Sequence, residues 1–224
     1  MRSVILVAGG QGTRMKTDIP KQFLKLNEKP LLYHSIMAFF NFDRDIEIIV
    51  VLPENHIKYW EESKMTYLDL PHHQLVVGGE TRFHSVKNGL SVAHGNVVAV
   101  HDAVRPCVSK KTIAFVYESA EKGNCTVPVI EANETIRLVQ SNENKALNRN
   151  ELRIVQTPQA FPTHLIKQAF ELPFENKFTD CASVLEAFGH KIVLSQGNIE
   201  NIKVTHPGDL ELATFYLKSS NIKK

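Results

Sequence analysis

A glycine-rich segment followed by two basic residues lies near the N-terminus and is the first place where chemistry is expected. The apolar run Ile5–Ala8 predicts a strand buried on both faces, and the segment Gly9–Gly12 follows it directly. Glycine lets the backbone adopt positive φ angles and bring its amides close to an anion, while Arg14 and Lys21 supply positive charge. The pattern predicts a cradle for a polyphosphate. Taken alone, it is also compatible with a surface turn that carries two solvated cations.

Two better-known glycine motifs do not fit this segment. The dinucleotide-binding fingerprint needs Gly or Ala three positions after Gly12, where Met15 stands. The P-loop needs Gly-Lys-Ser/Thr at a fixed distance after its first glycine, whereas Lys21 follows Pro20. The segment therefore predicts a phosphate-binding loop of neither kind.

An aspartate and a second lysine are candidates for the same site. Asp102 follows the apolar run Val97–Val100, and open α/β sheets bind ligands at the carboxyl ends of their parallel strands. Asp102 is therefore a candidate partner for a metal ion or a hydroxyl group; the alternative is a turn cap that pairs with Arg105. Lys203 stands between two apolar residues, so on a strand its side chain faces away from theirs, either to water or into the site.

The elements that must position these residues alternate between strand-like and helical patterns. Strands are predicted at 5–8, 46–52, 75–77, 97–100, 126–129, 192–194 and 201–205. Helices are predicted at 31–40, 57–68, from 80 or 81 through 90, at 110–122 and 163–171, from 179 or 180 through 188, and from 207 onward, with a rigid turn at 157–162. This order predicts an α/β protein, with an open, mostly parallel sheet covered by helices on both faces. We expect residues 1–224 to form one domain.

Residues 131–155 break this alternation and predict a protruding β-arm. The run Thr135–Val139 alternates polar and apolar residues, a polar turn-rich cluster follows, and a second extended run covers Leu152–Val155. An isolated hairpin is marginally stable in water, so the apolar side chains Ile136 and Leu138 need a partner surface. Exchange of arms in a homodimer would supply it, and a mobile lid within one subunit is the alternative.

Composition limits the remaining function classes. The chain has 26 Lys and Arg against 24 Asp and Glu, a formal net charge of +2, which does not suggest a general nucleic-acid or membrane-surface protein. The sequence has no signal-peptide pattern and no apolar run that could span a membrane, so we expect a cytoplasmic protein. Three widely spaced cysteines suggest buried or idle thiols rather than disulfides or a zinc site.

Two further features are expected to be structural. The adjacent histidines His72 and His73 have no Cys or carboxylate nearby at ligand spacing, which argues against a metal site there. In the helix predicted at 57–68, Trp60 and Leu68 are expected on one side, where they would pack against the core.

Taken together and in order, the motifs resemble one family over nearly the whole chain. They are Ala8-Gly9-Gly10-x-Gly12-x-Arg14-Met15, Pro20-Lys21-Gln22, Gly78-Gly79-x-x-Arg82-x-x-Ser85-Val86-x-x-Gly89-Leu90, His101-Asp102-Ala103-Val104-Arg105-Pro106, Thr157-Pro158-Gln159, Thr179-Asp180 and Ile202-Lys203-Val204-Thr205. Each fragment is weak by itself. The ordered set is similar to the 2-C-methyl-D-erythritol 4-phosphate cytidylyltransferases of the non-mevalonate isoprenoid pathway.

The resemblance implies a Rossmann-like nucleotidyltransferase fold, a homodimer and a Mg²⁺-dependent reaction. The family joins CTP to methylerythritol phosphate and releases diphosphate. Ribitol-5-phosphate cytidylyltransferases share the glycine loop, the Pro-Lys-Gln and the Asp-x-x-Arg-Pro motifs, so they remain an alternative. A non-catalytic nucleotide-binding protein on the same fold would be expected to lose its cations, whereas the chain keeps Arg14, Lys21 and Lys203.

The resemblance also implies roles for individual residues. Those implied for catalysis are Arg14, Lys21 and Lys203. Those implied for the nucleotide are Ala8, Gly9, Gly10, Gly12, Gly79, Glu80, Ser85 and Asp102, with Asp102 also the nearest protein partner of Mg²⁺. Those implied for the polyol phosphate are Arg105, Thr135, Arg149, Thr157 and Thr179, with Thr135 and Arg149 reaching across the dimer. The chain departs from the usual pattern at Gly9, Glu80 and Val104, of which Val104 would narrow the alcohol pocket.

Overall fold

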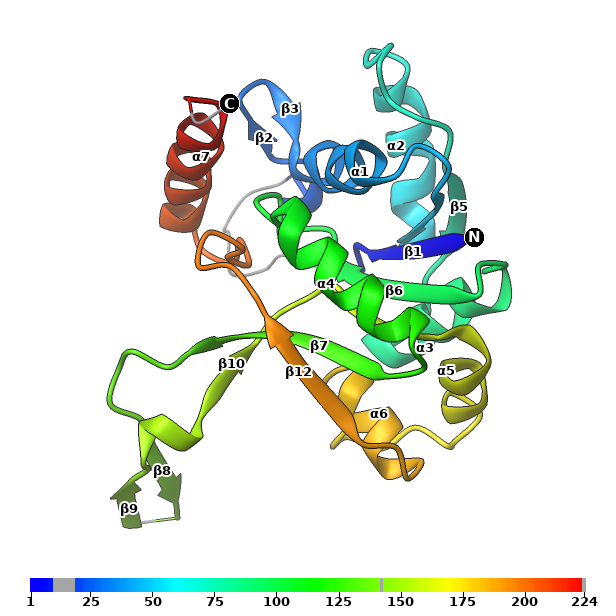
Figure 1. Cartoon of the computed structure of the whole chain (residues 1–224). Coiled ribbons are helices and arrows are strands. Elements are labelled where there is room, and N and C mark those ends of the chain that lie inside the picture. Colours follow the sequence, from blue (N-terminus) through cyan, green and yellow to red (C-terminus); the bar gives the residue numbers. More distant parts are fainter. Residues whose placement is uncertain (10–18, 142, 223–224) are drawn as a thin grey trace.

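The computed structural model describes residues 1–9, 19–141 and 143–222, and a mixed β-sheet is at its centre (Figure 1). Its strands are β1 (Arg2–Val7), β4 (Glu47–Leu52), β5 (Gln74–Val77), β6 (Val97–Asp102), β7 (Cys125–Glu131), β10 (Arg153–Val155), β11 (Gln159–Pro162) and β12 (Ile192–Gln196). Within the described residues, the sheet has the order β10-β7-β11-β6-β1-β4-β5, and β12 pairs with β7. The predicted α/β class with an open, mostly parallel sheet is confirmed.

The parallel half of the sheet fixes where a ligand can bind. Strands β5, β4, β1 and β6 are neighbours in this order and run parallel to one another. The chain moves outward from β1 to β4 and β5, then returns to place β6 on the other side of β1. The direction of winding therefore reverses between β1 and β6, where Val7 is in register with Asp102. Such reversal points open a crevice at the carboxyl ends of the strands.

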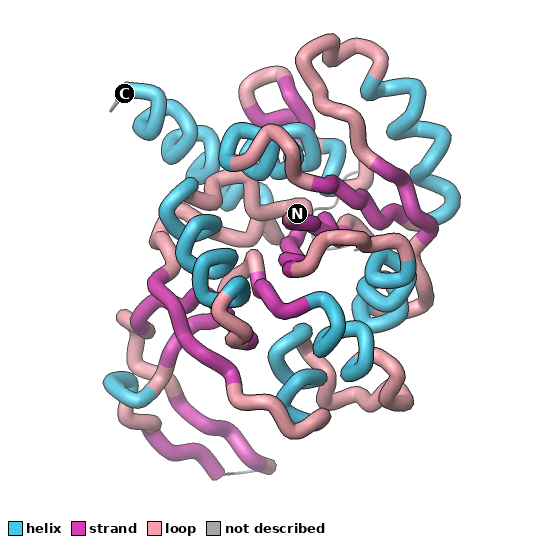
Figure 2. Tube along the Cα trace, turned by 45° about the vertical axis from the view of Figure 1, so that its right-hand side comes forward, coloured by secondary structure: helices cyan, strands magenta, loops and turns pink. Residues whose placement is uncertain are grey.

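Helices cover both faces of the sheet (Figure 2). One face carries α1 (Leu31–Phe42), α2 (Glu54–Lys64) and α4 (Lys110–Glu121), and the other carries α3 (Arg82–Ser91), α5 (Thr163–Ala169) and α6 (Cys181–Ala187). The alternation of β1 explains this division, because Val4 and Leu6 join the first core and Ile5 and Val7 the second. Both faces of β1 are therefore covered by helices and shielded from solvent, as its continuous apolar sequence predicted.

A third, smaller core holds the C-terminal helix against the site. Helix α7 (Pro207–Ile222) contacts the short strand β2 (Lys25–Leu26), which pairs with β3 (Lys29–Pro30). Buried side chains from α7, β2 and two loops meet there, including Val104 and Val204. These two residues flank the site, so α7 stabilises the loops that form it.

The helix predicted at 57–68 begins and ends earlier than expected. Helix α2 starts directly after Pro53 and ends at Lys64, after which the chain turns. Trp60 is fully buried, as predicted, whereas Leu68 is 98% exposed because it lies beyond the helix and out of register with Trp60. The packing role expected for Leu68 is therefore wrong.

The rigid turn predicted at 157–162 is in large part a strand. After the cis peptide bond between Thr157 and Pro158, β11 pairs antiparallel with β6 over four residues and also contacts β7. Its two flanking prolines suggested a turn. Pro162, however, is the last residue of the strand and directly precedes α5, so it leaves the interior of the strand unbroken.

The arm is present but is paired differently from the prediction. Strand β8 (Arg137–Gln140) forms a hairpin with β9 (Glu143–Ala146), and the second extended run becomes β10, which pairs with β7. The short 3₁₀ helix η3 (Arg149–Glu151) connects β9 to β10. Figure 1 shows that the β8–β9 hairpin extends away from the sheet. The polar cluster predicted as a turn therefore supplies β9.

Three further expectations have clear outcomes. Residues 201–205, predicted as a last strand, form none, although Val204 N–H donates to the Val104 carbonyl oxygen (3.0 Å). The three cysteines are buried and free, as expected. Within the described parts of the chain, the helices are too short or too polar to cross a bilayer.

Candidate functional site

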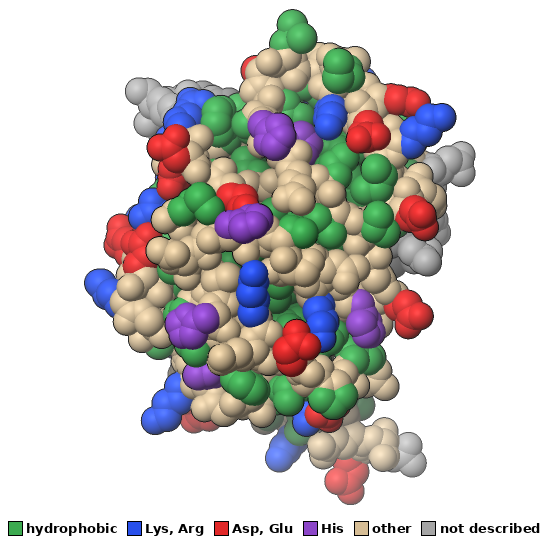
Figure 3. All heavy atoms as spheres, turned by 90° about the vertical axis from the view of Figure 1, so that its right-hand side faces the viewer, with side chains coloured by type: hydrophobic (Ala, Val, Ile, Leu, Met, Phe, Trp, Pro, Cys, Tyr) green, Lys and Arg blue, Asp and Glu red, His purple; other side chains and the backbone are tan. Residues whose placement is uncertain are grey.

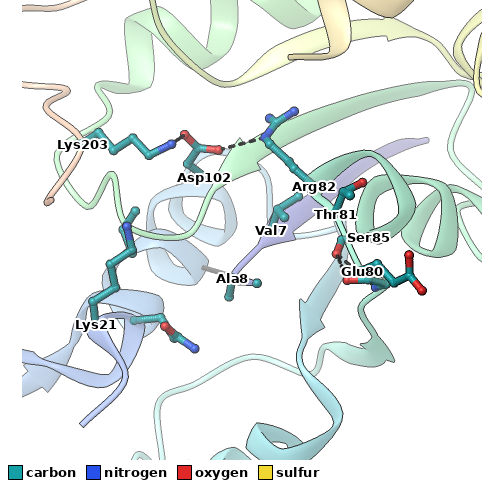
Figure 4. Close-up of a pocket in the computed structure, with 13 residues that line it drawn as sticks. Val7, Ala8, Lys21, Glu80, Thr81, Arg82, Ser85, Asp102 and Lys203 are labelled. Carbon is teal, nitrogen blue, oxygen red and sulfur yellow. Dashed lines mark hydrogen bonds and ion pairs between the residues drawn. The ribbon is translucent and has the colours of Figure 1, made fainter. Parts of the chain in front are cut away.

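A pocket opens at the reversal point between β1 and β6 (Figure 4). The end of β1, the segment after Pro20, the start of α3, the end of β6 and the loop before α7 contribute to it. Its described lining consists of Val7, Ala8, Gly9, Lys21, Gln22, Gly79, Glu80, Thr81, Arg82, Ser85, Asp102, Val104 and Lys203. The described residues expected at the nucleotide and at the reacting phosphate therefore lie together.

Asp102 is the centre of the charge arrangement. Its Oδ2 lies 2.9 Å from Lys203 Nζ and 3.5 Å from Arg105 Nε, and its Oδ1 lies 3.5 Å from Arg82 Nε. Burial alone would raise the pKa of this carboxyl group, but Arg82, Lys203 and Arg105 outweigh burial and hold the pKa well below its usual range. One carboxylate thus faces three cations, which leaves a positive surplus suited to a polyanion.

Lys203 reaches the pocket although its segment is not a strand. Asn201, which is fully buried, donates from Nδ2 to the Thr157 carbonyl oxygen (2.7 Å) and anchors the segment. The bond from Val204 N–H to Val104 holds its other end. Of the two orientations considered for Lys203, the structure has the one into the site, with the side chain 42% exposed.

Lys21 enters the pocket from a different segment. It begins the 3₁₀ helix η2 (Lys21–Phe23), whose Phe23 packs against Tyr59 and Trp60 with ring centroids 4.7 and 6.0 Å apart. This packing fixes the start of the Lys21 side chain, and Lys21 is only 9% exposed. Figure 4 shows Lys21 extending into the pocket from the segment opposite Asp102. The two candidate catalytic lysines therefore reach one cavity from separate parts of the chain.

The loop before α3 is held by a side chain of that helix. Ser85 Oγ accepts from Gly79 N–H at 3.1 Å and donates to the Gly79 carbonyl oxygen at 3.4 Å. A Cβ atom on Gly79 would lie 2.4 Å from His84 Cβ, so only glycine fits. Thr81 caps the helix as expected, accepting from His84 N–H. The backbone of this loop is rigid, as recognition of a base by fixed donors and acceptors requires.

The departures from the family pattern have different consequences. A Cβ atom on Gly9 would lie 3.5 Å from Ser85 Oγ, an ordinary contact, so the site has room for the usual alanine. Glu80 is exposed at the pocket wall, and no hydrogen bond fixes its carboxylate among the described contacts. Val104 lines the pocket and is 5% exposed, so its methyl groups occupy space there.

The residues expected at the polyol phosphate are not gathered in this way, and the described lining includes none of them. Arg105 lies beside the pocket, where Nη1 donates to the Asn201 carbonyl oxygen (2.7 Å). Thr157 is buried behind Asp102, and Thr179 is exposed before α6. Thr135 and Arg149 are exposed on the arm, where Arg149 Nη1 donates to the Asn133 carbonyl oxygen (2.8 Å). Gly10, Gly12 and Arg14 lie outside the described residues.

Arg82 is a site residue to which the sequence reasoning gave no role. It lines the pocket, faces Asp102 and donates from Nη1 to Cys181 Sγ at 3.6 Å. Its pKa is raised, because the neighbouring Cys181 and Asp102 outweigh the effect of burial. The available signal was its position, one residue after the helix cap and three after the end of the second glycine pair. The thiol of Cys181 is therefore buried but has a partner.

The donor set does not form a preassembled metal site. Among residues 1–9, 19–141 and 143–222, no three His, Cys, Asp or Glu side chains converge as a metal would require. Asp102 offers one carboxylate, and its oxygens face cations. Such a site fits Mg²⁺ only when substrate phosphates supply most of the ligands, as is common for this ion. Both ring nitrogens of His73 are engaged in hydrogen bonds, one with Trp60 and one with the Pro71 carbonyl oxygen.

Comparison with known proteins identifies the family of the chain. The family model of 2-C-methyl-D-erythritol 4-phosphate cytidylyltransferase (IspD) matches residues 2–219. The enzyme of that name from Phocaeicola vulgatus is 48% identical over 213 residues, covering 95% of this chain and 97% of the relative. The one from Bacteroides fragilis is 44% identical, covering 96% and 99%.

Solved structures give the same result. The 2-C-methyl-D-erythritol 4-phosphate cytidylyltransferase of Francisella tularensis superposes with a TM-score of 0.77 at 35% identity, covering 96% of this chain and 99% of that one. The Thermus thermophilus enzyme of the same name has a TM-score of 0.76 at 30% identity, covering 97% and 100%.

Proposed function

This chain belongs to the 2-C-methyl-D-erythritol 4-phosphate cytidylyltransferase family, and we propose that it carries out the family reaction in the pocket between β1, α3 and β6. It transfers the cytidylyl group of CTP to methylerythritol phosphate and releases diphosphate, in the non-mevalonate route to isoprenoid precursors. The observation that carries the assignment to this pocket is the convergence of Lys21 and Lys203 on one cavity beside Asp102. We treat residues 1–224 as one domain, with 131–155 as its arm.

The chemistry needs positioning and charge more than a general base. A phosphate oxygen of the polyol phosphate attacks the α-phosphorus of CTP, and the bond to the β-phosphate oxygen breaks. The nucleophile is already anionic, so catalysis rests on alignment and on stabilising the charge that builds on the five-coordinate phosphorus. Lys21 and Lys203 supply that charge from two sides, and Arg14 serves the triphosphate as the family resemblance implies. Arg82 and Arg105 hold Asp102, which holds Lys203.

The nucleotide lies along the wall formed by the start of the glycine segment and the second glycine pair. Ala8, Gly9 and Gly79 offer backbone groups there, and Ser85 keeps Gly79 in place. Glu80 is the exposed acid on this wall and is suited to accept from a ribose hydroxyl or the cytosine amino group. Because these groups are on a rigid loop, a base with a different donor pattern leaves some of them unpaired.

Mg²⁺ enters this scheme with the triphosphate. Among the described lining residues, Asp102 is the acidic side chain that lies beside Lys203, so it would hold the ion together with phosphate oxygens and water. Mg²⁺ bound in this way neutralises phosphate charge.

A homodimer explains why the arm residues do not line the pocket of their own chain. Thr135 and Arg149 are exposed on the arm, and exposed apolar side chains lie on β8, β10 and β12. Those side chains are Val139, Ile154, Val155, Val193 and Leu194. The face beyond β5 is different, because there charged and histidine side chains are interspersed among the hydrophobic ones (Figure 3). We therefore place the dimer contact at the arm, with Thr135 and Arg149 completing the polyol phosphate site of the partner subunit.

The polyol phosphate would then bind beyond Asp102, between Arg105 and the arm of a second copy. In the arrangement that the family resemblance implies, Arg105 and Thr179 of the same chain lie beside this substrate. Both substrates are small phosphorylated metabolites, so we place the reaction in the cytoplasm.

Diphosphate release tests the assignment. Purified protein with CTP and Mg²⁺ is offered methylerythritol phosphate and ribitol 5-phosphate in parallel. Turnover with the first alone is expected. Preference for ribitol 5-phosphate would support the site and the mechanism but contradict the proposed substrate. Absence of turnover with both substrates would favour a nucleotide-binding protein without catalytic activity.

A further inference from the structure

The turn from Asp102 to Arg105 is tied by hydrogen bonds to four other segments of the molecule. Four of these bonds join the turn to other segments, and one closes the turn itself. The bonds are Ala103 N–H to Val7 O (3.1 Å), Arg105 N–H to Asp102 O (3.0 Å), Ser35 Oγ–H to Ala103 O (2.9 Å), Val204 N–H to Val104 O (3.0 Å) and Asp102 N–H to Thr157 Oγ (3.0 Å). The turn carries two charged site residues, so these bonds decide where both side chains begin.

The imidazole of His101 contributes to this set with both of its nitrogens. His101 is fully buried at the end of β6, and its Nε2 lies 3.1 Å from the Arg105 carbonyl oxygen. A carbonyl oxygen only accepts, so Nε2 carries the proton. Its Nδ1 then accepts from the Thr157 hydroxyl at 3.1 Å, and that hydroxyl accepts from Asp102 N–H. Burial lowers the pKa of His101 to about 4, in keeping with a neutral ring.

We infer that His101, acting through Thr157 and the Arg105 carbonyl, is a positioning residue that sets the direction in which Asp102 and Arg105 leave their turn. The inference rests on the proposed function, since it explains how this site is held in register. One ring bridges the first and last residues of the turn. A displaced turn would move Asp102, and with it the Lys203 ammonium that lies 2.9 Å away.

The same geometry assigns Thr157 an indirect role. Thr157 is 5% exposed and is absent from the described lining of the pocket. Its hydroxyl proton goes to His101 and one of its lone pairs to Asp102 N–H, so the hydroxyl is already engaged on both sides. Thr157 thus serves the polyol phosphate site through the Asp102 turn, not by a hydroxyl contact with the substrate.

A purely structural histidine is the competing explanation, and the chain offers a matched control. His73 is also buried, donates from Nδ1 to the Pro71 carbonyl oxygen (2.8 Å) and accepts at Nε2 from Trp60 Nε1 (2.9 Å). Its contacts are with α2 and the loop before β5, and it does not line the described pocket. Loss of either ring should cost stability, but only loss of His101 should change turnover per folded molecule.

The test compares kcat and KM with urea unfolding for two sets of variants. His101→Phe removes both bonds, and His101→Asn keeps an acceptor near Nδ1 and provides a milder lesion if the Phe variant folds poorly. His101→Phe should lower kcat about 100-fold, as expected for misplacement on the scale of 1 Å, with KM for CTP within about 2-fold. His73→Phe should lower the urea midpoint similarly and leave kcat unchanged.

Thr157 completes the test. Thr157→Val should reproduce the loss of kcat, and Thr157→Ser should keep kcat near the wild-type value. The double variant of Thr157→Val and His101→Phe should have a kcat no lower than the more damaged single variant, because both substitutions break the same chain of hydrogen bonds. The inference would be overturned if the losses of kcat in the two single variants multiplied in the double variant and if Thr157→Val alone raised KM for the polyol phosphate. Those results would mean that Thr157 contacts the substrate directly. Unchanged kcat in His101→Phe would also overturn the inference. If wild-type protein uses ribitol 5-phosphate instead, the proposed substrate is wrong and the same comparison of variants still decides the role of His101.

Discussion

Lys203 Nζ lies 2.9 Å from Asp102 Oδ2, which is the shortest of the ion pairs between described residues in the pocket. The two residues come from unrelated segments, the loop before α7 and the end of β6. Asp102 is 10% exposed at its side chain and Lys203 is 42% exposed, so the lysine is free to exchange partners while the carboxylate stays in place.

Replacement of Lys203 tests whether this ammonium group serves the reaction. Lys203→Ala should lower kcat by about 100- to 1,000-fold and leave KM for CTP within about 3-fold, because its charge matters most as the five-coordinate phosphorus forms. Steady-state diphosphate release measures both constants. The control is Lys87→Ala, which breaks an exposed lysine–carboxylate pair of 3.0 Å with Glu171 and should leave both unchanged. Equal effects of the two substitutions would remove Lys203 from the catalytic role.

The two glycine positions in the nucleotide wall should respond differently to alanine. At Gly79 the new Cβ would lie 2.4 Å from His84 Cβ, so the loop must shift and KM for CTP should rise about 10-fold or more. At Gly9 the nearest atom is Ser85 Oγ at 3.5 Å, so Gly9→Ala should be close to wild type. Titration of CTP by calorimetry checks the same order without turnover. Similar affinities in both variants would show that the second glycine pair does not contact the nucleotide.

Mixing two damaged variants tests whether the arm acts on the partner subunit. Lys21→Ala should abolish turnover, and Arg149→Ala should raise KM for the polyol phosphate far more than for CTP, since Arg149 is suited to grip that phosphate. If Arg149 serves the partner, a mixed dimer has one site with both lesions and one intact site, so an equimolar mixture should regain about a quarter of wild-type activity. No recovery after subunit exchange, shown by mass-tagged heterodimers, would place Arg149 in its own subunit's site or outside the site.

Acidification should destabilise the protein through its buried histidines. Burial lowers the pKa of His73 below 6.5 in the folded state, and His34 and His101 shift in the same direction. The unfolded chain therefore takes up protons first, and stability is lost as pH falls from 6.5 towards the folded-state pKa values. Urea unfolding between about pH 7 and about pH 5 should show a smaller loss for His73→Gln than for wild type. Equal losses of stability in wild type and His73→Gln would show that folding does not lower the pKa of His73.

Local pattern predicted the parallel half of the fold well, because its cause is local. Strand β1 is apolar from Val4 to Val7, and these side chains alternate between two helical layers, so continuous hydrophobicity identified it. Strand β11 was missed because it is specified by its neighbours: it is held between β6 and β7, and its prolines suggest a turn when read alone. Leu68 was misplaced for a similar reason, since the end of α2 at Lys64 depends on the turn that follows.

The site was predictable where residue type and strand position decide it, and less so where distant segments meet. Asp102 and Lys21 followed from motif and position. Arg82 has no local feature that predicts its pairing with Asp102, which arises because the start of α3 lies beside the end of β6. The bond between His101 and Thr157 joins residues 56 positions apart, so no pattern within either segment predicts it.

The cations around Asp102 can exchange one anionic partner for another. Each cation already has a carboxylate oxygen nearby, so a phosphate that binds Lys203 replaces one anionic partner with another. The net gain in free energy is smaller than at a site whose cations face only water, and the carboxylate takes the lysine back when the anion leaves. A pocket built in this way holds a triphosphate long enough to align it and still lets diphosphate go, which matters in enzymes whose turnover is limited by product release.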